Sequence, residues 1–167
     1  GTVSGRTVVA ILGSSTGFTG ALWFDDVSQS LVSTGSTQAG EIWNGGFDDG
    51  VIGDCFFLSN NLPNWVWLGG SNAGFVVNNA SQNTNQSLTI VYPNNLASQY
   101  FPAKTGLTYT VEGYMMTPAA NRMTGSTAYA QFLLEFFTPA GGVSSVSVVG
   151  SAKLTNGTPA DTWIKVG

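Results

Sequence analysis

The chain has 167 residues, a net charge of −4 and 43% hydrophobic residues, which is enough for one domain with a substantial core. Its five basic residues are spread along the sequence, so no basic surface for the phosphates of nucleic acid is expected. Histidine is absent and Cys55 is the only cysteine. This composition excludes an internal disulfide, a Ser-His-Asp or Cys-His catalytic site and any metal site built on imidazole.

Only 8% of the residues are charged, and polarity comes from Asn, Ser, Thr and Gln alongside 22 glycines. We expect a secreted protein from this uncharged polar surface. No hydrophobic run approaches the roughly 18 residues of a membrane span, and no basic-then-apolar signal segment begins the chain. We therefore expect a soluble protein without a membrane partner, from which any export signal has been removed. Cys55, in GDCFFLS, is expected to be a small buried hydrophobic residue.

Short runs rich in β-branched and aromatic residues alternate with clusters of Gly, Asn, Ser and Pro along the whole chain. In chain order these runs are RTVVAIL (6–12), GALWFDDVS (20–28), NWVWLG (64–69), GFVVN (74–78), QSLTIVY (86–92), TYTVEGYMM (108–116), AYAQFLLEFF (128–137), VSSVSVVGSAKL (143–154) and TWIKV (162–166). About nine strands at this spacing, with no competing helical period, predict an all-β sandwich or barrel.

The order of the segments is unusual near the N-terminus. GALWFDDVSQSL (20–31) has the form of a last strand, an apolar run closed by paired acids and a polar exit, yet it comes early. LVSTGSTQAGE (31–41) follows without apolar periodicity and predicts a flexible connector. IWNGGFDDG (42–50) then has the form of a beginning.

NGGF followed by an acid resembles the opening strand of secreted carbohydrate-binding modules with a galactose-binding-like jelly-roll fold. The chain is similar to that family in further segments, which occur in the family's order: NWVWLGG, AKTGLTYTVEGYM, AQFLLEFFTPAGG and DTWIKVG. In the family a segment like DTWIKVG is followed by strands that resemble residues 6–31 of this chain. The resemblance covers nearly the whole chain.

The resemblance implies a single jelly-roll β-sandwich over residues 1–167, with its strand order permuted relative to the family. Residues 1–31 would supply the family's C-terminal strands, 32–41 would be a linker, and 42–167 would supply the N-terminal and central strands. Both a natural circular permutation and a window cut from a tandem array explain this order. The leading strands would complete their own chain in a monomer, or a neighbouring copy in a domain-swapped dimer.

Two acidic pairs, Asp25–Asp26 and Asp48–Asp49, would come together if the family's first and last strands are neighbours. The family often holds a structural calcium there, and Asp25 and Asp48 match its ligand-bearing acids. Calcium takes about six to eight oxygens from carboxylates and backbone carbonyls. The resemblance therefore implies structural calcium. The alternative is that these acids accept hydrogen bonds from backbone N–H groups in turns.

Aromatic residues, five Trp, five Tyr and ten Phe, exceed what a sandwich of this size needs inside. Flat rings stack on the apolar faces of sugars, and neutral polar groups suit sugar hydroxyls. Trp65 and Trp67 stand two apart on one strand and should share a face. The candidate carbohydrate contacts, each with packing or turn structure as the alternative, are Trp65, Trp67, Tyr114, Tyr129, Glu112, Glu135 and Asn64, with Asn60 and Asn61 in the same loop.

We expect a non-catalytic module that binds a polysaccharide or oligosaccharide and holds a secreted enzyme on its substrate. The main rival is a structural or adhesive β-module of a repetitive extracellular protein, which has no sugar ligand. An aromatic side chain exposed on the concave face would favour the carbohydrate-binding module.

A glycosidase would need two carboxyls across a cleft, for which Glu112 and Glu135 are the candidates if they face the same sheet surface. We expect no enzyme, because no loop insertions build a deep cleft.

Overall fold

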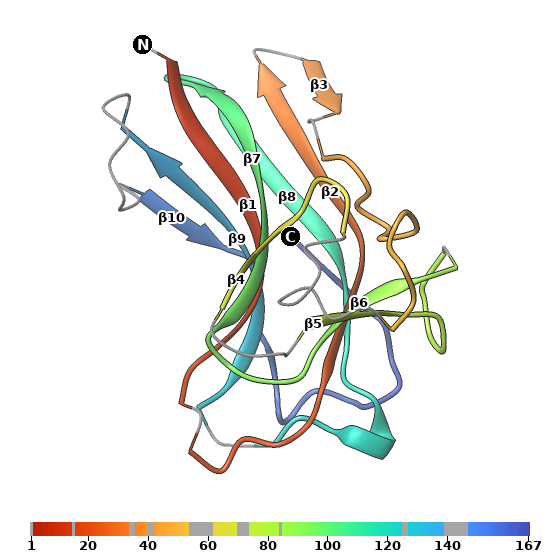
Figure 1. The fold of residues 1–167 in the computed structure, drawn as a ribbon. Helices are drawn as coiled ribbons and strands as arrows, with labels where there is room; N and C mark the ends of the chain where they lie inside the picture. The colour runs from red at the N-terminus through yellow and green to blue at the C-terminus, as the bar shows by residue number, and fades with distance from the viewer. Residues whose placement is uncertain are drawn as a thin grey trace.

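The computed structural model describes residues 2–14, 16–33, 36–39, 42–53, 62–69, 74–83, 85–124, 127–138 and 147–167. Over these residues the regular structure is β-strand, apart from one 3-10 turn, η1 (Ala119–Asn121). The strands form two antiparallel sheets of six strands that pack face to face (Figure 1). In the described part of the chain, no helix has the length and apolar character needed to cross a membrane.

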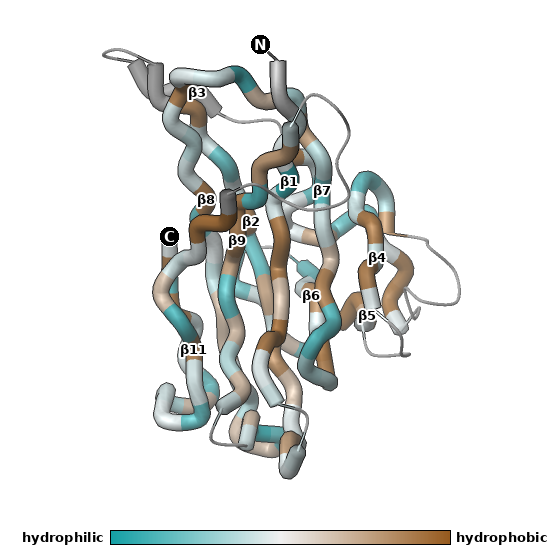
Figure 2. Tube along the Cα trace, turned by 90° about the vertical axis from the view of Figure 1, so that its left-hand side faces the viewer, coloured by the Kyte–Doolittle hydropathy of each residue, from teal (hydrophilic) through white to brown (hydrophobic). Residues whose placement is uncertain are grey.

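The first sheet, sheet A, has the strand order β10-β9-β1-β7-β4, and β11 also pairs with β9. Its strands are β1 (Thr2–Leu12), β4 (Val66–Leu68), β7 (Asn95–Lys104), β9 (Tyr129–Phe137), β10 (Ser147–Gly150) and β11 (Leu154–Thr155). Figure 2 shows β1 between β9 and β7, with hydrophobic residues along its middle.

The second sheet, sheet B, has the order β12-β8-β2-β6-β5, and β3 also pairs with β2. Its strands are β2 (Leu22–Ser33), β3 (Ser36–Ala39), β5 (Gly74–Val77), β6 (Ser87–Ile90), β8 (Thr108–Met116) and β12 (Ile164–Val166). The pairing of β2 with β8 shifts register between Asp25 and Ser28, which marks a bulge in β2.

The predicted all-β sandwich is confirmed. Its inner faces meet in one core, in which the buried rings of Phe24 and Phe132 lie edge to face at 5.9 Å. The leading strands β1 and β2 each occupy the centre of a sheet and pair on both sides with later strands. The N-terminal segment is therefore integral to both sheets. Cys55, expected in the core, lies outside the described residues.

The expected linker, residues 32–41, contains regular structure. β2 continues to Ser33, and β3 (Ser36–Ala39) pairs back onto β2. Part of the segment expected to be a connector is therefore a strand. Ser and Thr without apolar periodicity suggested a loop, but a strand at the margin of a sheet can be polar because its backbone hydrogen bonds to the neighbouring strand.

Residues 42–50, expected as an opening strand, form turns instead. Asn44 and Phe47 have positive φ angles of 54° and 61°, which a strand does not accommodate. The Phe47 N–H donates to the Asn44 carbonyl at 3.1 Å and closes one turn. This segment still lies against β2, because the Val27 N–H donates to the Gly45 carbonyl at 3.0 Å.

Candidate functional site

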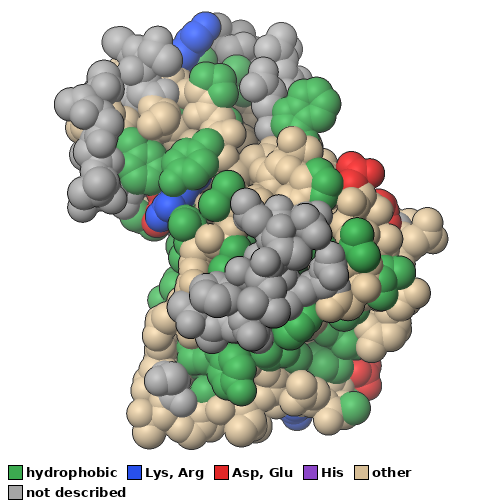
Figure 3. All heavy atoms as spheres, viewed as in Figure 1, with side chains coloured by type: hydrophobic (Ala, Val, Ile, Leu, Met, Phe, Trp, Pro, Cys, Tyr) green, Lys and Arg blue, Asp and Glu red, His purple; other side chains and the backbone are tan. Residues whose placement is uncertain are grey.

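A row of side chains crosses four adjacent strands on the outer face of sheet A. The strand register pairs Val148 with Glu135, Glu135 with Arg6, and Arg6 with Tyr100. The residues adjacent to Glu135 in β9 pack into the core, so alternation along the strand places this row on the outer face. We call these four residues, together with Phe137, the sheet A patch. In Figure 3 hydrophobic side chains lie beside a basic and an acidic one in the upper lobe.

The two charged side chains of the patch, Arg6 and Glu135, pair with each other, and Arg6 also lies near two aromatic rings. Arg6 donates through Nε to Glu135 Oε2, and through Nη1 to the Tyr100 hydroxyl at 3.3 Å. Its guanidinium carbon lies 5.4 Å from the Phe137 ring centre and 5.9 Å from the Tyr100 ring centre. Burial lowers the pKa of Arg6, but the hydrogen bonds to Glu135 and Tyr100 outweigh burial and raise that pKa above its ordinary value. Arg6 therefore stays charged at any ordinary pH.

Tyr100 is the accessible ring of the patch. It is 54% exposed, whereas Phe137 is buried and its ring lies 6.2 Å away at a tilt of 37°. Val148 is also exposed. The patch thus presents one open aromatic ring beside a preorganised ion pair, an arrangement that can stack on an apolar surface and hydrogen-bond at its edge.

The two predicted tryptophans share a face, but that face is the core. Trp65 is 4% exposed, its ring lies 5.3 Å from Phe47, and its Nε1 donates to the Asn44 carbonyl at 3.0 Å. Trp67 is half-buried, packs on the same core and lies against Gly74. The packing alternative therefore describes Trp65, whose buried ring offers no surface to a sugar.

The remaining predicted contacts are dispersed. Tyr114 is half-buried in β8, and Tyr129 is half-buried in β9 with Lys153 Nζ 3.8 Å from its ring centre. Asn64 is exposed in a turn with φ of 70°, while Asn60 and Asn61 lie outside the described residues. Of the predicted carbohydrate contacts, only Glu135 belongs to the sheet A patch.

Glu112 and Glu135 do not face the same surface. Glu112 lies on the outer face of sheet B, where its Oε1 is 2.9 Å from Lys165 Nζ, and this hydrogen bond raises the pKa of Lys165. Glu135 lies on the outer face of sheet A, paired with Arg6. The sandwich separates the two carboxyls, so they cannot act together across one cleft as a glycosidase pair requires.

The acidic pairs meet the same loop, the one that joins β5 to β6. Asp25 is fully buried and accepts hydrogen bonds from the backbone N–H groups of Asp26 at 2.8 Å and Gln82 at 2.6 Å. Asp48 is exposed and accepts from the Asn85 N–H at 3.0 Å. Both carboxylates accept hydrogen bonds from backbone N–H groups, as the turn alternative predicts. No group of three or more His, Cys, Asp or Glu side chains converges among the described residues.

We expect Asp25→Asn to lower the free energy of unfolding by about 1.5 kcal/mol, because the amide nitrogen would face a half-buried backbone N–H that loses its acceptor. Urea unfolding measures this change. Asp48→Asn is the matched control, since Asp48 accepts one exposed hydrogen bond, and it should cost less than about 0.5 kcal/mol. Equal losses in the two variants would contradict the structural role assigned to Asp25.

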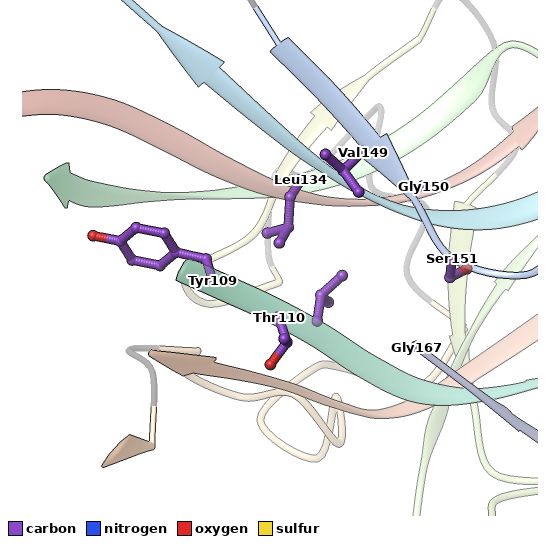
Figure 4. Close-up of a pocket in the computed structure, with 8 residues that line it drawn as sticks. Tyr109, Thr110, Leu134, Val149, Gly150, Ser151 and Gly167 are labelled. Carbon is purple, nitrogen blue, oxygen red and sulfur yellow. The ribbon is translucent and has the colours of Figure 1, made fainter. Parts of the chain in front are cut away.

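A separate cleft of about 180 Å³ opens between the sheets, with β8 on one side and β9 and β10 on the other. Figure 4 shows Leu134 and Val149 on the sheet A side, Thr110 on β8, and Gly167 nearby. The lining is mostly apolar and includes none of the predicted carbohydrate contacts. An apolar lining suits an apolar group better than a hydroxyl-rich one. The sheet A patch is therefore the better candidate for a polar ligand.

Sequence reasoning missed Tyr100 because it missed β7. Pro102 and the surrounding Asn and Ser residues weaken the strand pattern, since proline lacks an N–H for pairing. The available signal was the spacing of Ala97, Phe101 and Ala103, which fall on the core face of the strand. Comparison of the chain with family models, curated proteins and solved structures found no match.

Proposed function

We propose that this protein is a secreted, non-catalytic carbohydrate-binding module with a permuted, galactose-binding-like jelly roll, which holds an attached enzyme on a polysaccharide. The observation that carries the proposal is the sheet A patch, where the exposed Tyr100 ring adjoins the Arg6–Glu135 pair. The apolar C–H face of a sugar would stack on Tyr100. The sugar hydroxyls would hydrogen-bond to Arg6 and Glu135, which already hold each other in place, and this reduces the entropy cost of binding.

The composition supports a neutral glycan as the ligand. The chain has few charged residues and many amide and hydroxyl side chains. Such neutral groups suit the hydroxyls of a neutral sugar. The one charged pair in the patch is internally neutralised, so the patch carries no net charge to attract an acidic polymer. We take the protein to be a monomer. Size-exclusion chromatography with light scattering would distinguish a monomer from a domain-swapped dimer.

The proposal is tested by screening the folded protein against plant, algal and microbial glycans, followed by calorimetric titration of each hit. We expect saturable binding to one class of neutral glycan, no binding after heat denaturation, and no release of sugar from the polysaccharide. A folded protein that binds no glycan in the screen would overturn the proposal. That outcome would favour the structural or adhesive module, a reading consistent with the buried position of Trp65.

Structural calcium at the loop between β5 and β6 is the second part of the proposal. Asp25 and Asp48 would be the carboxylate ligands, completed by backbone carbonyls. Asp26 and Asp48 both contact this loop and take part in neither described ion pair, which leaves negative charge there for a cation to neutralise.

We expect calcium at millimolar concentration to raise the unfolding temperature by several degrees and chelation to reverse the rise. A ligand that binds only the folded state stabilises it by about 2.7 kcal/mol at 100 times its Kd. Scanning calorimetry measures the shift, and magnesium at the same concentration is the control because it favours a smaller octahedral site. Unchanged unfolding temperatures with calcium and with chelator would show that these acids only accept hydrogen bonds.

A further inference from the structure

Trp43 combines the largest exposure of any described aromatic side chain with a tightly held backbone. Its side chain is 65% exposed. The Trp43 N–H donates to Gln99 Oε1 at 2.7 Å, and Gln99 Nε2 donates to the Trp43 carbonyl at 2.9 Å. One side-chain amide thus satisfies both backbone groups of Trp43, as a neighbouring strand would. We call this pair of hydrogen bonds the Gln99 clasp.

The Gln99 clasp is anchored inside the sandwich. Gln99 is buried in β7 and lies opposite Thr7 in the strand register, and the Thr7 hydroxyl donates to Gln29 Oε1 of the facing sheet at 3.2 Å. Breaking the clasp would leave a buried amide unsatisfied, which costs free energy. The residue after Trp43 is fixed as well, because the Asn44 carbonyl accepts the indole N–H of Trp65.

The clasp brings Trp43 close to the sheet A patch. Tyr100 directly follows Gln99, and consecutive Cα atoms are about 3.8 Å apart. β4 pairs with β7 only as far as Ser98, so within the described residues β7 has no β4 partner at Gln99 and Tyr100. Trp43 is attached at this edge of β7 through the inner-facing Gln99, while Tyr100 projects from the outer face. The Trp43 backbone and the Tyr100 side chain therefore lie against the same short stretch of β7, and both rings are exposed.

Covering an exposed tryptophan ring with a ligand is favourable, because it removes apolar surface from water. A backbone already held in place reduces the entropy lost in that binding. Two exposed rings attached at the same short stretch of β7 suit a ligand with several flat apolar faces joined in a chain. A single terminal sugar would contact one ring only. An oligosaccharide would present successive sugar faces to both.

We propose that the site takes an extended neutral oligosaccharide that crosses the edge of β7, with Tyr100 and Trp43 contacting different sugar units of the same chain. Gln99 is a positioning residue that acts through Trp43. This inference rests on the proposed carbohydrate-binding function and adds a second contact, a chain-length requirement and a binding mode along the chain.

The test is calorimetric titration with cello-, xylo-, manno- and laminari-oligosaccharides of two and six units. For the wild type we expect six units of the preferred series to bind at least about tenfold more tightly than two units. Trp43→Ala should lose that gain for six units and keep the affinity for two units within about twofold. Gln99→Ala should show the same loss of length dependence, a change that a general loss of stability would not produce, because two-unit binding is retained.

Tyr92→Ala is the matched control, because Tyr92 is exposed like Trp43 but lies outside β7, before its first residue. We expect it to bind both lengths as the wild type does. A Trp43→Ala variant that binds six units as tightly as the wild type would overturn the second contact and leave the proposed function intact. Equal weakening for two and six units would place Trp43 and Tyr100 at one sugar and also overturn the inference. A wild type that binds none of the four series would overturn the inference, whereas the proposed function is decided separately by the glycan screen.

Discussion

Replacing Gly45 with alanine is expected to lower the free energy of unfolding by about 4 kcal/mol, because the added Cβ would overlap the backbone carbonyl oxygen of Val27. Backbone atoms cannot rotate aside as a flexible side chain can. The turn would have to move away from the bulge in β2, and the hydrogen bond from the Val27 N–H to the Gly45 carbonyl would be lost. The unfolding temperature should fall by roughly 10 °C, since 1 kcal/mol corresponds to about 2–4 °C in a chain of this size.

Gly157→Ala is the control for this prediction. Gly157 is exposed in a turn, and the nearest atom to an added Cβ is Thr155 Oγ1 at 3.7 Å, an ordinary contact. Its stability should stay within about 0.5 kcal/mol of the wild type. If both glycine variants unfold at the same temperature, the close approach of residue 45 to β2 is wrong.

Replacing Tyr100 with alanine is expected to weaken glycan binding about 30-fold or more. Truncation of a central aromatic contact costs about 2 kcal/mol or more in binding, and each 1.4 kcal/mol is about tenfold in Kd. The loss should come from the missing ring, because β7 remains paired with β1 through its backbone. Titration calorimetry with the glycan found in the screen measures the change, and the unfolding temperature checks that the variant is folded.

Two further variants separate the ring from its hydroxyl and from general exposure. Tyr100→Phe keeps the ring and removes only the 3.3 Å hydrogen bond from Arg6, so its affinity should fall less than about fivefold. Tyr92 has the same 54% exposure as Tyr100, so Tyr92→Ala controls for the loss of any exposed ring and should bind normally. Equal weakening by Tyr92→Ala and Tyr100→Ala would contradict the assignment of the sheet A patch.

The fold was predictable because its signal is local. Period-two alternation and regularly spaced turn residues recur through the chain, and they specify strands without reference to distant contacts. Segments with a weak local pattern were assigned differently. β3 is polar, β7 carries Pro102, and residues 42–50 interrupt their few hydrophobic residues with Asn and Gly, and the structure folds them into turns.

The candidate site was predictable only at Glu135. An acid inside FLLEFF stands out in a strand because a carboxylate there needs a partner. Its partner, Arg6, is 129 positions away in the sequence and meets it only because β1 inserts between β9 and β7. Trp65 stood out equally, but an aromatic residue in an alternating strand fits the core as well as a binding surface, and local sequence does not distinguish the two faces.

By itself the sequence determined that this is an all-β chain without histidine chemistry, because composition and alternation act residue by residue. The tertiary structure alone decided which rings are exposed, since burial depends on which face of each strand the second sheet covers. It also decided that Arg6, Glu135 and Tyr100 lie in one row and that Gln99 holds Trp43 at its edge. Those contacts join residues distant in the sequence, and strand order and register set them.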